Sequence, residues 1–328
     1  MNHLTEKASG YVKNIMERSI KRKPHERVVV VFDRQSGLSR IMAEAYQTAI
    51  PDGEFIDFDQ VTPEQILEKI NALTPGDIVV LVQSTSFRLN QFRFRLELFN
   101  RKLKTVEHLH LDRMSEDQWE TWIDALAFDP ETDGVLAREL KTRIDTASHV
   151  EIACGPHRLV WEGGMEEAKL NIGDYTGMEN IGGTYPIGEV FTEARDLSKV
   201  NGELLIYAFA GDDFMMRFYK PFLAIVRNGL IEAGPDAPQE FKDVLKKIAE
   251  TEQPIVREFG IGLNRAITRE RPVNDITAFE RTYGLHLSLG EKHSVYKKPG
   301  LVPQKTRFHV DVFPAFDSVH LDKYSIIF

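Results

Sequence analysis

The chain is poor in cysteine, because Cys154 is the only one among its 328 residues. One cysteine cannot form a disulfide within the chain or supply a cluster of thiolate metal ligands. This fits a reducing compartment, so we expect a cytoplasmic protein. We expect Cys154 to be a small buried apolar side chain rather than a nucleophile.

Long apolar runs and an excess of positive charge are also missing. Runs such as Val28 to Phe32 are far shorter than the roughly 20 residues that cross a bilayer, and we expect no export signal in the polar amino terminus. The 41 Lys and Arg residues are outnumbered by 50 Asp and Glu, a net charge of −9 that repels phosphate backbones. We therefore expect no membrane and no nucleic-acid partner.

The length favours two domains, which we place at residues 1–150 and 151–328. In the first domain, β-branched runs alternate with amphipathic segments, a pattern typical of an α/β fold with a Rossmann-like parallel sheet. The turn after the first strand contains only Gly37, so the glycine-rich fingerprint of dinucleotide-binding proteins is absent. We expect this sheet to act as a scaffold without a nucleotide.

Two further segments of the first domain have informative patterns. Residues 86–103 are basic and rich in phenylalanine, which predicts a helix with a buried aromatic stripe and a solvated basic face. Residues 106–111 predict a strand on which His108 and His110 share one face in structural roles.

The second domain has short strands and turn signals, which predict an α+β fold. Asn228-Gly229 is the clearest hairpin turn, because this dipeptide tolerates the positive φ angles of a type I′ turn. One helix is expected from Pro238 to Thr251, where apolar residues recur at helical spacing.

In this domain, side chains that can ligate a metal ion occupy single positions of otherwise apolar strands. Alternation over residues 307–313 puts His309 and Asp311 on the same side of a strand, where an imidazole and a carboxylate can bind one cation. Other such donors are Glu189, Glu258 and His286. Each of these residues alone is typical of a polar side chain that makes its hydrogen bonds within the protein. Three carboxylates brought together, however, repel one another unless cations bind between them. The set therefore predicts a metal site.

At these residues the sequence resembles the aminopeptidase T family of thermophilic metalloaminopeptidases. Its G-E-V-F-T, E-x-G-I-G-x-N, H-L-x-L-G and H-x-D segments match the chain in order, at residues 188–192, 258–264, 286–290 and 309–311. The resemblance implies a usually dimeric subunit with an α/β part and a metal-bearing α+β part. It also implies two divalent ions, Zn, Co or Mn, held by Glu189, Glu258, His286, His309 and Asp311.

The chain departs from this family at one position. The family tyrosine that follows the motif histidine by seven residues is replaced by His293, with Tyr296 near enough in sequence to substitute. We expect a metal-dependent hydrolase that removes amino-terminal residues from peptides or cleaves a related amide, with Glu258 as base or ligand and His293 as proton donor. Either Glu193 or Asp174 is a candidate to bind the α-amine of the substrate.

Two alternatives stay open. The sequence is also similar to the related 2,5-dihydroxypyridine dioxygenases, whose single Fe(II) is held by two histidines and an aspartate, with a histidine in place of Glu258. That reading implies opening of an aromatic ring of a small molecule. The third hypothesis is a non-catalytic binding module on the same scaffold.

Overall fold

The computed structural model describes residues 3–86, 94–302 and 305–328. The chain forms two compact units, and neither is one continuous stretch of sequence. The first unit contains Met1–Val135, Asn171–Gly188 and Asn264–Ala278. The second contains Leu136–Leu170, Glu189–Leu263 and Phe279–Phe328. The first unit thus includes two segments from beyond residue 150.

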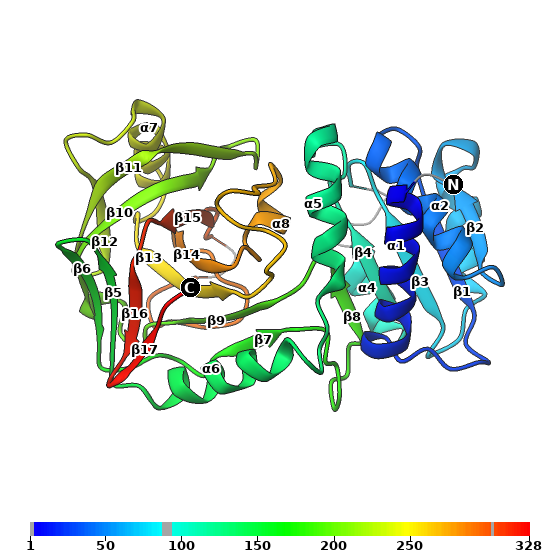
Figure 1. Ribbon diagram of the computed structural model, residues 1–328, viewed down its shortest axis with the longest axis horizontal. Helices are drawn as coiled ribbons and strands as arrows, with labels where there is room; N and C mark the ends of the chain where they lie inside the picture. The colour runs from blue at the N-terminus through cyan, green and yellow to red at the C-terminus, as the bar shows by residue number, and fades with distance from the viewer. Residues whose placement is uncertain (1–2, 87–93, 303–304) are drawn as a thin grey trace. The chain divides into compact units, whose positions relative to one another are not determined.

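The first unit is built around the parallel sheet A that the sequence pattern predicted (Figure 1). Its strands are β1 (Val28–Phe32), β2 (Glu54–Asp57), β3 (Ile78–Val82), β4 (Lys104–His108) and β8 (Gly182–Thr184), in the order β2-β1-β3-β4-β8. Every residue of β1 and β3 is buried. Their unbroken apolar sequence is typical of parallel strands that are covered on both faces.

Helices alternate with these strands, as the pattern predicted. They are α1 (His3–Asn14), α2 (Gly37–Ala49), α3 (Pro63–Asn71), α4 (Phe94–Asn100) and α5 (Trp119–Asp124). Ser36 and Thr62 begin α2 and α3 with capping boxes, in which each hydroxyl accepts a hydrogen bond from the third residue of its helix. Of the predicted basic helix, residues 87–93 lie outside the described residues.

One local prediction about sheet A is wrong. Strand β4 ends at His108, and His110 has a φ angle of 57°, so the two imidazoles do not share the face of one strand. His108 is fully buried, and its Nε2 is 2.8 Å from the Tyr46 hydroxyl. Burial lowers the pKa of His108 to about 3, so its ring is neutral at physiological pH.

The second unit is built around the curled antiparallel sheet B (Figure 1). Its strands are β5 (His149–Cys154), β6 (His157–Glu162), β7 (Lys169–Asn171), β9 (Glu189–Glu193), β10 (Val200–Ala210), β11 (Met216–Arg227), β12 (Leu230–Ala233), β13 (Val256–Gly262), β14 (Gly284–Leu289), β15 (Val310–Pro314), β16 (Ser318–Leu321) and β17 (Tyr324–Ile326). The main order is β17-β16-β5-β6-β10-β15-β14-β13-β9-β7, and β11 pairs with β10 and β12.

The predicted hairpin is present in sheet B, and the predicted helix follows it as α7 (Gln239–Ala249). Asn228 and Gly229 join β11 to β12 with φ angles of 51° and 81°, the left-handed conformation that a type I′ turn requires. The remaining helices are α6 (Gly134–Thr146) and α8 (Ile276–Phe279). Among the described residues, no helix combines the length and the apolar character needed to cross a membrane.

Sheet A contains a buried ion pair whose loss should be costly. The Nζ of Lys104 lies 2.7 Å from Oε2 of Glu26, and both side chains are buried. We expect Lys104→Met to lower the free energy of unfolding by about 3 kcal/mol, because Glu26 keeps a buried charge without its cation. Urea denaturation measures the change. Lys69→Met, which breaks the exposed pair with Glu54, should barely move the midpoint, and equal losses would contradict this account.

Candidate functional site

Four of the predicted metal ligands lie on four neighbouring strands of sheet B, in the order β9-β13-β14-β15, and His309 directly precedes β15. Residues paired across antiparallel strands project to the same face of the sheet. The register pairs Glu189 with Gly262, His286 with Gly260, and Asp311 with Ser288. Glu258 lies on the same face, because it precedes Gly260 by two residues. The sheet therefore gathers donors from distant parts of the sequence on one face.

Two glycines of β13 leave space for side chains and backbone from the neighbouring segments. A Cβ atom on Gly260 would lie 2.2 Å from Nε2 of His286, closer than any real contact allows. The imidazole of His286 thus lies directly over the backbone of Gly260. The motif glycine at this position is needed because the histidine fills the volume that a side chain would take.

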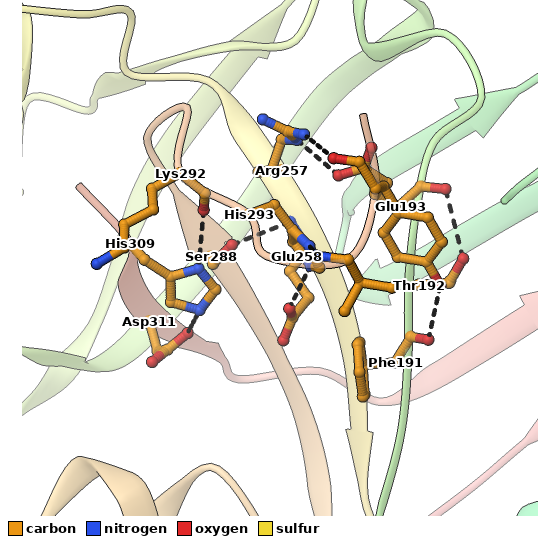
Figure 2. A network of polar contacts seen from close by, with 12 residues as sticks. Phe191, Thr192, Glu193, Arg257, Glu258, Ser288, Lys292, His293, His309 and Asp311 are labelled. Atoms are coloured by element: carbon orange, nitrogen blue, oxygen red, sulfur yellow. Dashed lines mark hydrogen bonds and ion pairs between the residues drawn. The ribbon is translucent and has the colours of Figure 1, made fainter. Parts of the chain in front are cut away.

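Glu258 is the centre of the first cluster of polar side chains. His286 Nε2 donates to Glu258 Oε1 over 3.2 Å. His293 Nε2 donates to Oε2 over 2.7 Å (Figure 2). All three side chains are buried. The backbone N–H of Glu258 also donates to the hydroxyl of Ser288 over 3.0 Å. The carboxylate is therefore held in one orientation by groups from β14 and from the loop that follows it.

The protonation of this cluster follows from these contacts. Burial by itself raises the pKa of the Glu258 carboxyl, but hydrogen bonds from His286 and His293 hold it well below its usual range. Burial lowers the pKa of His286, yet the Glu258 carboxylate outweighs this and raises it. Glu258 is therefore an anion between two imidazoles.

His309 and Asp311 form the second cluster, as the alternation predicted. His309 Nε2 lies 3.2 Å from Asp311 Oδ1, and its Nδ1–H donates to the Lys292 carbonyl over 3.1 Å (Figure 2). Burial lowers the pKa of His309, but the charge of Asp311 opposes this and raises it to about 10. The rings of His309 and His293 are 6.1 Å apart between centroids, so the two clusters are neighbours.

Glu189 has a partner that the sequence analysis did not identify. Its Oε2 contacts Nη1 of Arg281, whose Nη2 lies 2.8 Å from Oε1 of Glu280. Burial raises the pKa of the Glu280 carboxyl to about 8, with Arg281 opposing the shift and the Glu189 and Asp311 carboxylates adding to it. A sequence signal was present, since Glu280 and Arg281 stand shortly before strand β14, and charged side chains that become buried need partners.

Three other polar residues near the site have specific partners. Tyr296 donates from its hydroxyl to the Glu167 carbonyl over 2.6 Å, whereas His293 contacts Glu258 directly. His293 therefore occupies the position next to the carboxylate that the family tyrosine was expected to fill. Glu193 is buried against Arg257, whose Nε lies 2.6 Å from Oε2 of Glu193 (Figure 2). The Nζ of Lys298 lies 3.3 Å from Oε1 of Glu193. Its carboxylate is thus already neutralised and is a poor candidate to bind a substrate amine.

The donor set fits a divalent cation in its chemistry, because imidazole nitrogens and carboxylate oxygens are common ligands of such ions. One buried atom at the site, His286 Nδ1, has no hydrogen-bond partner, which is costly without a further ligand. Within the described ranges, no three His, Cys, Asp or Glu side chains are arranged around one common point. The donors bind one another in pairs, so metal binding requires them to reorient.

The close contact at Gly260 generates a prediction. Gly260→Ala should displace the His286 imidazole and lower the free energy of unfolding by about 1–3 kcal/mol, because the core around it is closely packed. Chemical denaturation and the NMR signal of the imidazole measure both effects. Gly10→Ala in α1 is the control, since nothing lies within 4 Å of its added Cβ. An unchanged His286 signal in Gly260→Ala would contradict the packing described here.

The His309–Asp311 pair generates a prediction about pH. The pKa of His309 is raised from 6.5 to about 10, so the protonated ring stabilises the fold fully below pH 6.5. That contribution is lost as the pH rises from 6.5 to 10. Urea denaturation of metal-free protein across this range should show a steeper loss for the wild type than for Asp311→Asn, which lacks the paired charge. Parallel pH curves would show that the pair does not form.

Comparison with known proteins supports the fold. No protein-family model and no curated protein matches the sequence. The solved 2,5-dihydroxypyridine dioxygenase from Pseudomonas putida KT2440 is similar in structure, with a TM-score of 0.65, 15% identity, and coverage of 99% of this chain and 95% of that one. Wild-type AmpT from Thermus thermophilus is similar with a TM-score of 0.57, 12% identity, and coverage of 98% and 97%. Both neighbours are enzymes, and at these identities the likeness shows that the chain shares their fold.

Proposed function

We propose that the chain is a metal-dependent hydrolase of the aminopeptidase type, which removes amino-terminal residues from peptides or cleaves a related amide. The observation that carries this proposal is the Glu258 carboxylate, held between the imidazoles of His286 and His293. It lies on the sheet face that also bears the His309–Asp311 pair. Hydrolysis of an amide by metal-activated water needs a carboxylate that can act as a base, held beside side chains that can ligate the metal ion.

The residues that would hold a divalent ion are His286, His309 and Asp311, with Glu258 as a further ligand or as the base. When bound, such an ion would lower the pKa of water towards about 7 and polarise the scissile carbonyl. Asp311 contributes a buried negative charge to this place, beside the His309 imidazole. His309 is oriented for it by the Lys292 carbonyl, which fixes the ring through Nδ1.

Proton movement is assigned to Glu258 and His293. The Glu258 carboxylate is an anion in the metal-free chain. We assign it as the acceptor of the proton that the attacking water loses, a role that would need the hydrogen bond from His286 to be released to the ion. His293 Nε2 lies 2.7 Å from that carboxylate and can deliver a proton to the leaving amine. Ser288 supports both roles through the backbone, because its hydroxyl accepts from the N–H of Glu258 and so fixes the main chain that bears the carboxylate.

A mononuclear Fe(II) dioxygenase that opens an aromatic ring is the second candidate. It is favoured by the composition of the donor set, since His286, His309 and Asp311 are two imidazoles and one carboxylate, the ligand set of non-haem iron oxygenases. The solved dioxygenase of similar fold is consistent with it. Oxygen uptake with a dihydroxypyridine and ferrous ion under controlled oxygen would distinguish it from hydrolysis.

The test of the hydrolase is an assay on aminoacyl-p-nitroanilides with Zn, Co or Mn. We expect Glu258→Gln to lower kcat about 100-fold or more, because the base is lost. Asp311→Asn should weaken metal binding about tenfold or more. The matched control is Glu203→Gln, which breaks another His–Glu pair of sheet B, His157–Glu203, and should leave kcat unchanged. Full activity of Glu258→Gln would contradict the assigned base.

Two simpler measurements complete the test. A chelator should lower the melting temperature if a resident ion stabilises the fold, and an unchanged value with no bound metal would favour a non-catalytic binding module. The homodimer that the family resemblance implies is checked by light scattering during size-exclusion chromatography.

A further inference from the structure

We propose that Arg281 takes the place of a second metal ion, so that this chain binds one divalent ion per subunit. The inference rests on the proposed metal-dependent function and deepens it. It differs from the two-ion site that the family resemblance implies, in which Glu189 is a metal ligand.

The contacts of Arg281 are those of a bound cation. Its guanidinium contacts Glu189 through Nη1 and Glu280 through Nη2, the latter at 2.8 Å. Only 8% of the Arg281 side chain and 7% of the Glu189 side chain are exposed. Glu189, the first of the predicted ligands along the chain, therefore already has a buried positive partner.

The charge around Arg281 explains why a cation is needed there. Burial lowers the pKa of Arg281, but attraction by the carboxylates of Glu189, Glu280, Glu258 and Asp311 raises it. The guanidinium therefore stays protonated, as arginine does throughout the physiological range. Carboxylates this close repel one another unless a positive charge lies among them, and Arg281 supplies that charge permanently.

The backbone is built to bring Arg281 to this place. Gly262 pairs with Glu189 on one side and with Gly284 on the other. A Cβ atom on Gly262 would lie 2.0 Å from the Thr282 carbonyl oxygen and 2.8 Å from that of Arg281. The segment before β14 thus lies directly over Gly262, which places Arg281 beside the start of β9.

The remaining donors suffice for one ion. Among the described contacts, none of Glu258, His286, His309 and Asp311 pairs directly with an arginine. His286 Nδ1 is buried without a hydrogen bond. A second ion at Glu189 would have to displace a buried guanidinium and leave it without its carboxylate. That cost makes the second position unfavourable for a metal.

The experiment is titration of metal-free, full-length protein with Mn²⁺, with free ion measured by electron paramagnetic resonance. We expect the wild type to bind one equivalent. Glu189→Gln should also bind one, with affinity within about twofold of the wild type, since Glu189 is not a ligand. Arg281→Met should bind a second equivalent, because Glu189 and Glu280 lose their resident cation.

Two control variants separate this effect from loss of any buried arginine. Arg257→Met removes the arginine paired with Glu193 on the same sheet and should still bind one equivalent. Arg281→Lys keeps a cation and should also bind one. If Arg281→Met does not fold, the wild type, Glu189→Gln and Arg281→Lys still decide the question.

The outcomes are distinct. Two equivalents in the wild type, loss of an ion in Glu189→Gln, or a single equivalent in folded Arg281→Met would overturn the role of Arg281 and leave the metal-dependent function standing. No bound ion in the wild type would overturn both. One equivalent in the wild type and in Glu189→Gln, with two in Arg281→Met, supports the inference.

Discussion

Neutralisation of buried negative charge is the constraint on which the site of the second unit depends. Carboxylates gathered in one place and shielded from water are costly unless each has a positive or hydrogen-bonding partner. Glu258 has two imidazoles, Asp311 has His309, and Glu189 has Arg281. These partners are required for folding whether or not a reaction follows. The same side chains that are candidates for catalysis are therefore also the counter-ions of the fold, and a change to any of them affects both.

Strand β13 meets this constraint by providing space as well as a side chain. Of its alternate residues on the site face, only Glu258 carries a functional group, while Gly260 and Gly262 leave room for His286 and for the segment of Arg281. Glycine in a strand weakens the strand, since it packs no side chain and loses more backbone entropy on folding. That cost is offset where a neighbour occupies the space. Close approach of neighbouring strands is thus how this sheet brings the donors together.

The pattern of the sequence predicted the elements better than it predicted the partners. Alternation of period two correctly placed His309 beside Asp311, and it identified the buried strands of sheet A. It could not reveal the Arg281–Glu189 pair, because that contact joins residues 92 positions apart. It depends on the register that places Glu189 of β9 opposite Gly262 of β13. His110 was misplaced for a local reason, since a positive φ angle after β4 ends the alternation that the strand prediction assumed.

Protons and metal ions compete for the same atoms in this arrangement. In the metal-free chain, His309 carries its proton because Asp311 is beside it, with a pKa raised to about 10. An imidazole must lose that proton before it can ligate a metal, so ion binding at His309 is coupled to proton release. Arg281 cannot take part in such an exchange, since its guanidinium does not lose its proton under physiological conditions. The site therefore combines the permanent positive charge of Arg281 with a position at His309 where a metal ion can replace a proton. Chemistry can occur at the second position.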